Sequence, residues 1–103
     1  MTRVTVNPGV CGMVCNIEVS NIDRHQLGLK IETKCDMICE LNKELNILGL
    51  RDALKPPGES IVYDYASKCR MHAACPVPVA IIKAIEVEAG MALPRPVSIE
   101  FES

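Results

Sequence analysis

Six cysteines and two histidines are the residues of this 103-residue chain whose types point most directly to chemistry. The cysteines are Cys11, Cys15, Cys35, Cys39, Cys69 and Cys75. His72 stands between the last two and completes the spacing C-x₂-H-x₂-C. Zinc prefers thiolate and imidazole ligands, and iron–sulfur clusters are held mainly by thiolates. The pattern therefore indicates a metal or cluster site, or else a reactive thiol.

Cys75 lies at the entrance of a predicted helix. Pro76 and Pro78 follow it, and proline fits the first helical positions because its missing N–H would have no partner there. The positive end of the helix dipole favours the thiolate form of a nearby cysteine. Cys75 is therefore a candidate ligand or nucleophile, with a small buried side chain as the alternative.

Four further residues have settings that favour ligation. Cys11 lies in a loop with glycines at positions 9 and 12, where the backbone can bend around a bound group. Cys35 stands between a predicted strand and a predicted helix, a junction with free helix N–H groups. Cys69 and His72 are three residues apart, so they would share a face if the helix continues. The alternative is that His72 is an exposed turn residue and Cys69 packs against Tyr65.

The two remaining cysteines are expected to have smaller roles. Cys15 shares the parity of Ile17 and Val19, and a free cysteine often behaves as a small buried hydrophobe. Cys39 falls toward the polar flank of a predicted helix and is an accessory candidate. We therefore expect Cys15 in the core. His25, in a hairpin loop, is expected on the surface.

Alternating apolar and polar residues predict four strands. They cover Arg3 to Val6, Val14 to Ser20, Leu27 to Thr33 and Val97 to Glu102. One apolar face and one polar face are typical of an antiparallel sheet that is covered on one side.

Apolar residues at helical spacing predict helices between the third and the last strand. They cover Asp36 to about Leu48, Ser60 to about Arg70 and Pro76 to Ala89, with a short helical piece over Leu50 to Leu54. The start of the second helix, at Ser60 to Tyr63, also fits a strand. The element order predicts an α+β two-layer sandwich in one domain, residues 1–103, with a mostly antiparallel sheet of about four strands and helices on one face.

Composition excludes several classes of protein. The net charge is −2 and no basic run or aromatic platform is present, so nucleic acid is not an expected partner. No apolar run reaches the roughly 20 residues that cross a bilayer. The N-terminus does not read as a signal peptide. We therefore expect a cytoplasmic protein with reduced cysteines; the alternative is a secreted protein with three disulfides.

The order of the cysteines resembles that of two protein groups. One is the N-terminal scaffold domain of the NifU/IscU iron–sulfur assembly proteins, and the other is the small cysteine-containing TSCPD domain. The similar pieces are "GVC" at 9–11, "KIETKC" at 30–35 and "AACPVPVAIIKAI" at 73–85. The scaffold proteins usually have Gly-Asp after the first cysteine, whereas this chain has Gly-Met at 12–13.

The resemblance implies three or four thiolates that converge at one end of the sheet. The implied ligands of zinc or an iron–sulfur cluster are Cys11, Cys35 and Cys75, with Cys69 or His72 as the fourth. The implied role is cluster assembly or that of a metal-stabilised accessory domain.

Two other functions remain open from the sequence. One is a thiol redox protein without metal, with Cys75 as the nucleophile and His72 as the nearby base. The other is an interaction module that forms a homodimer or binds another protein through its methionines. No Ser-His-Asp set, phosphate loop or catalytic carboxylate pair is recognisable, which favours a role other than catalysis.

Overall fold

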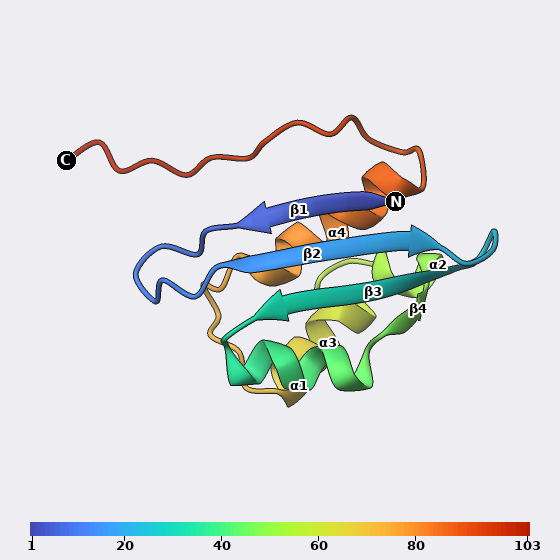
Figure 1. The fold of residues 1–103 in the computed structure, drawn as a ribbon, viewed down its shortest axis with the longest axis horizontal. Coiled ribbons are helices and arrows are strands. Elements are labelled where there is room, and N and C mark those ends of the chain that lie inside the picture. Colours follow the sequence, from blue (N-terminus) through green and yellow to red (C-terminus); the bar gives the residue numbers. More distant parts are fainter.

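Four strands form one antiparallel sheet in the order β1-β2-β3-β4 (Figure 1). A computed structural model describes all of residues 1–103. The strands are β1 (Thr2–Val6), β2 (Cys15–Asn21), β3 (Gln26–Thr33) and β4 (Ile47–Gly49). The helices are α1 (Asp36–Glu44), α2 (Leu50–Ala53), α3 (Ile61–Lys68) and α4 (Val77–Glu88). The predicted fold class, an α+β sandwich with a mostly antiparallel sheet, is confirmed.

The helices cover one face of the sheet and leave the other to solvent (Figure 1). On the covered face, Ile17 of β2 lies opposite Ile31 of β3 in the register of the sheet, and both are buried. On the open face, Arg3 and Glu18 form an ion pair at 3.2 Å. The alternation of apolar and polar residues therefore predicted the covered and open faces of these strands correctly.

The core between the sheet and the helices is aliphatic. Helix α4 packs against β1 and β2, and α1 packs against β3. The largest fully buried apolar side chains are Ile17, Leu27, Leu41, Leu45, Ile81, Ile85, Val19, Val62 and Val77. None of the helices is both long and apolar enough to cross a bilayer.

The predicted helix from Asp36 to about Leu48 is wrong at its C-terminal end. Helix α1 ends at Glu44, because Leu45 takes φ −119° and ψ 75°, outside the helical region. The chain then joins the sheet, and Leu48 lies opposite Leu27 in β4. Both leucines of this stretch, Leu45 and Leu48, are buried, so their spacing fitted a helix as well as it fits the observed turn and strand.

Asn42 completes the edge of β3 where β4 is too short to reach. Its side-chain N–H donates to the Leu29 carbonyl at 2.9 Å, and its side-chain oxygen accepts from the Ile31 N–H at 2.9 Å. The Asn46 carbonyl accepts from the Leu29 N–H at 2.8 Å. These contacts satisfy backbone groups that an edge strand would otherwise leave unpaired.

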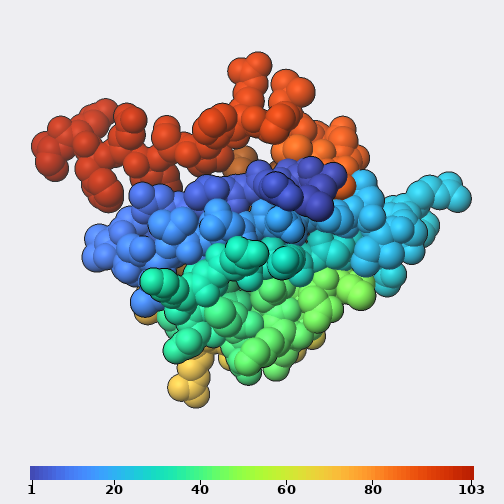
Figure 2. All heavy atoms as spheres, viewed as in Figure 1, coloured from blue at the N-terminus to red at the C-terminus, as the bar shows by residue number.

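The predicted strand from Val97 to Glu102 is also wrong for the single chain. Residues 91–103 have no secondary structure and are exposed throughout, and Figure 2 shows this C-terminal segment projecting from the body of the molecule. Beyond Met91, the only backbone hydrogen bond runs from the Arg95 N–H to the Leu93 carbonyl. The alternation is present, but a strand also needs a neighbour, and this segment has none within the chain.

Glu88, the last residue of α4, connects this helix to the sheet through hydrogen bonds and an ion pair. Its carboxylate accepts from the Thr2 hydroxyl at 2.7 Å and from the Asn21 N–H at 3.2 Å, and it pairs with the N-terminal ammonium at 3.3 Å. The hydrogen bond from Thr2 is the main reason that the pKa of Glu88 lies below its usual value of 4.5. The contacts favour the charged carboxylate.

Glu88→Gln is expected to destabilise the protein in a pH-dependent way. The folded pKa lies below the unfolded one, so the carboxylate stabilises the folded state above about pH 4.5 and this contribution is lost as the pH falls through the folded pKa. At pH 7 the free energy of unfolding should fall by about 1 kcal/mol. Urea unfolding at pH 7 and at acidic pH measures the difference, which should shrink in acid. If Glu88→Gln lowers the free energy of unfolding equally at both pH values, the stabilising role of the charged carboxylate is contradicted.

Candidate functional site

The topology brings five of the six cysteines, all except Cys69, to one end of the sheet. In the register, Val6 at the end of β1 lies opposite Cys15 at the start of β2, and Cys15 lies opposite Thr33 at the end of β3. Cys35 and Cys39 follow directly at the start of α1. Cys75, at the entrance of α4, lies at the same end, whereas Cys69, at the end of α3, lies near Glu40 and Glu44 of α1. Cys11 lies in the loop between β1 and β2.

Thr33 connects three of these cysteines. Its hydroxyl oxygen accepts a hydrogen bond from the Cys35 N–H at 3.2 Å and lies 3.3 Å from the Cys15 sulfur, which donates to it. Its carbonyl accepts from the Cys39 sulfur at 3.4 Å. A threonine at the last position of β3 therefore holds the start of β2 and the start of α1 in fixed relation.

Cys15 lies within electrostatic range of three other sulfurs. Burial raises the pKa of its thiol, the hydrogen bond with Thr33 lowers it, and the neighbouring Cys75, Cys35 and Cys11 raise it. We call Cys11, Cys15, Cys35 and Cys75 the thiol cluster. Cys11, Cys35 and Cys75, which were predicted as ligands, thus lie at the same end of the fold as Cys15, which was expected only in the core.

Cys75 is half-buried at the entrance of α4. Burial raises the pKa of its thiol more than the hydrogen bond from the Val77 N–H lowers it, and the neighbouring Cys35 and Cys11 raise it further. The helix N-terminus alone would favour a thiolate. Burial and the other sulfurs outweigh this effect, so the net shift of the Cys75 pKa favours the neutral thiol.

Cys11 is the exposed member of the thiol cluster. It lies in a tight turn in which the Gly12 N–H donates to the Gly9 carbonyl at 2.9 Å. Gly9 and Gly12 have φ of +89° and +69°, the left-handed region that favours glycine. A Cβ at either glycine would meet no atom within 4 Å, so the turn is not held in place by packing around these two residues.

Cys69 and His72 do not share a helical face, contrary to the prediction. Helix α3 ends at Lys68, and Arg70 takes φ +56° in the turn that follows. The pKa of the Cys69 thiol is raised by burial and then by the carboxylates of Glu44 and Glu40, not by other cysteines. His72 is exposed. Neither residue joins the thiol cluster in this conformation.

The donor types of the thiol cluster fit a thiophilic metal, but their present positions do not form a finished site. Four sulfurs without a carboxylate match zinc or an iron–sulfur cluster better than magnesium or calcium. No group of three or more histidine, cysteine, aspartate or glutamate side chains is placed so that it could hold one ion. A metal would therefore require these side chains to move closer to one another.

Sequence reasoning missed the contributions of Cys15 and Thr33. The parity of β2 correctly indicated that Cys15 points to the covered face, but parity says nothing about position along the strand. The signal that could have found both residues is that each stands at the same end of its strand, next to the expected sites at Cys11 and Cys35.

Comparison with known proteins yields one family. Neither the curated proteins nor the solved structures contain a match to this chain. The sequence model that matches residues 2–101 is described as a family of unknown function (DUF6951). Since the match spans nearly the whole chain, including the thiol cluster and most of the C-terminal segment, the protein belongs to the DUF6951 family.

Proposed function

We propose that the protein binds a zinc ion or an iron–sulfur cluster through the thiol cluster, as a cytoplasmic accessory or assembly protein. The observation that carries this proposal is that four sulfurs from three separate parts of the sequence, at residues 11 and 15, at 35 and at 75, lie at one end of the sheet. Packing alone does not account for it, because Cys11 is exposed and Cys75 is only half-buried.

The electrostatics of the thiol cluster support a bound cation. Burial and the neighbouring sulfurs raise the pKa of Cys15 and of Cys75, so charging several of these thiols together is unfavourable without a counter-charge. A metal cation supplies that charge, and binding then releases the thiol protons. The same arrangement that favours the neutral thiols in the free protein therefore suits a ligand set.

Metal binding would be coupled to closure of the turn that holds Cys11. The other three members are carried by strand ends and helix entrances, whereas this turn contains two glycines in left-handed conformations. Cys69 or His72, in the neighbouring loop, stays an alternative source of the fourth ligand, as the resemblance to the scaffold proteins implies.

Titration of the reduced protein with Zn²⁺, and with Co²⁺ as an optical probe of thiolate ligation, tests the proposal. Cys75→Ser is expected to lower the affinity at least about 100-fold, because a ligand is lost and not only a neighbour. Cys39→Ser is the matched control at the same end of the fold and should bind nearly as the parent does. Affinity should also rise with pH, because the ligands must lose protons. Anaerobic expression followed by iron and sulfide analysis distinguishes a cluster from zinc.

Two results would refute the proposal. One is a folded, reduced protein that takes up neither zinc, cobalt nor iron. The other is tight binding that Cys75→Ser leaves unchanged. If Cys69→Ser abolishes binding and Cys15→Ser does not, the metal site is retained but its fourth ligand is Cys69.

A further inference from the structure

One edge of the sheet is covered and the other is free. At β3, the backbone groups beyond β4 are satisfied by Asn42 and Asn46. At the opposite edge, β1 pairs only with β2, and no backbone hydrogen bond reaches its outer side. An edge strand with unpaired N–H and carbonyl groups is a template for a further strand.

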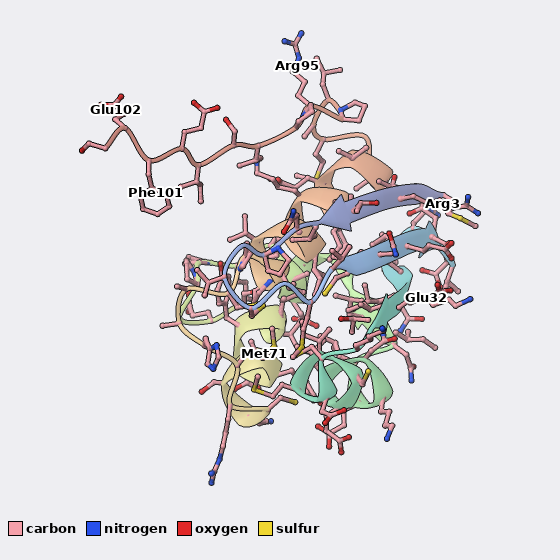
Figure 3. All side chains as sticks on the ribbon, turned by 60° about the vertical axis from the view of Figure 1, so that its left-hand side comes forward. Arg3, Glu32, Met71, Arg95, Phe101 and Glu102 are labelled. Carbon is pink, nitrogen blue, oxygen red and sulfur yellow. The ribbon has the colours of Figure 1, made fainter.

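The C-terminal segment has the pattern of a strand and no partner. Val97, Ile99 and Phe101 form its apolar side and are 58%, 82% and 95% exposed. Figure 3 shows Phe101 and Glu102 at its far end, well apart from the sheet and the helices. The family match extends to residue 101, so the segment is part of the family's domain. An apolar row this exposed calls for a surface that covers it.

We propose that residues 97–102 pair with the free edge of β1 in a second copy of the chain, and that the exchange is reciprocal. Antiparallel pairing with Ile99 opposite Val4 places Val97 opposite Val6, so that apolar side chains meet on the face that the helices cover. Val4 is only partly buried in the single chain although it packs against the core, and the added strand would complete its burial.

Charge favours the same register. With Ile99 opposite Val4, Glu100 lies opposite Arg3 on the open face of the sheet. The Arg3 side chain is 73% exposed and already pairs with Glu18 on its other side. Opposite charges directly across two strands stabilise the pairing. Arg3 would then lie between two carboxylates.

The chain's own C-terminal segment cannot form this pairing. It runs in the same direction as its own β1 (Figure 1), so docking there would be parallel. With Ile99 again beside Val4, Ser98 and not Glu100 would lie beside Arg3. In a twofold dimer, residues 97–102 of the second copy can lie between β1 and residues 97–102 of the first copy. Each strand then runs antiparallel to the strands beside it. That order needs about 10 Å between a chain's β1 and its own segment, a span that residues 91–96 can bridge at about 3.3 Å per residue.

The oligomeric state of the full chain, measured by analytical ultracentrifugation over about 1 to 100 µM, tests the proposal. The parent should form a dimer. Ile99→Lys and Phe101→Lys should each weaken it at least about tenfold, because each removes a buried apolar side chain from both interfaces. Neither variant should unfold the monomer, because both side chains are exposed in the single chain. Ile47→Lys, at an exposed apolar residue of β4, is the control and should leave the dimer intact.

A charge exchange tests the register. Arg3→Glu should weaken the dimer about three- to tenfold, because the two equivalent contacts become repulsive. Glu100→Arg in the same chain should restore most of the loss. A parent protein that stays monomeric from about 1 to 100 µM overturns the proposal. This holds also if the amides of residues 97–102 are protected from hydrogen exchange, because the segment would then dock on β1 of its own chain. A dimer that survives Ile99→Lys and Phe101→Lys, or fails in Ile47→Lys, also overturns it.

Discussion

Replacing Ile81 with alanine is expected to lower the free energy of unfolding by about 2–5 kcal/mol. Ile81 is 0% exposed and lies in the middle of α4, the helix that covers β1 and β2. Alanine would leave a cavity between the helix and the sheet, because close-packed neighbours relax only in part. Domains of this size are commonly stable by about 5–15 kcal/mol, so the loss is a large fraction of the whole.

Val79→Ala is the matched control on the same helix. Val79 is 42% exposed, so truncation should cost less than about 1 kcal/mol, as surface substitutions usually do. Urea unfolding followed by circular dichroism measures both variants. Equal losses at positions 79 and 81 would mean that α4 does not face the sheet as described.

Asn42→Ala is expected to cost about 2–3 kcal/mol, because it leaves the Leu29 carbonyl and the Ile31 N–H of β3 without their partner. The effect comes from unpaired backbone groups and not from lost apolar contact. Asn42→Asp should fall between alanine and the parent, because a carboxylate can accept from Ile31 but cannot donate to Leu29.

Asn46→Ala is the control that separates the loss of the Asn42 side-chain hydrogen bonds from any effect of changing a residue in the neighbouring turn. The Asn46 side chain is exposed and donates to the Lys43 carbonyl at 3.1 Å, so its loss should cost about 0.5 kcal/mol. Hydrogen exchange reads the site directly: the Ile31 amide should exchange faster in Asn42→Ala and not in Asn46→Ala. Unchanged protection of Ile31 in Asn42→Ala would contradict the described edge.

Strands β2 and β3 were predictable because each carries a full alternation that ends at a loop. Their register also follows from the covered face, since a shift by one residue would turn Ile17 or Ile31 to solvent. The stretch from Leu45 to Leu48 was not predictable in the same way. The spacing of Leu45 and Leu48 fits a helix as well as a turn followed by a strand. The strand forms because β3 has an unpaired edge there, and the local sequence does not reveal that edge.

The C-terminal segment shows the opposite limit of sequence reasoning. The alternation of apolar and polar residues indicates which side chains would share a face. Whether a strand forms depends on a neighbouring strand, which can lie in another molecule. The thiol cluster was partly predictable, because Cys11, Cys35 and Cys75 stand at strand and helix boundaries that meet at one end. The absence of a shared helical face for Cys69 and His72 was not predictable, because α3 ends at Lys68 and the turn at Arg70, with φ +56°, contains no glycine that would mark it in the sequence.

The contact between Glu88 and the N-terminal ammonium has a practical consequence for preparing the protein. Any peptide fused ahead of Met1 converts this ammonium into an uncharged amide and removes one partner of the Glu88 carboxylate. An affinity tag or an acetyl group on that nitrogen should therefore lower the melting temperature slightly, and cleavage of the tag directly before Met1 should restore it.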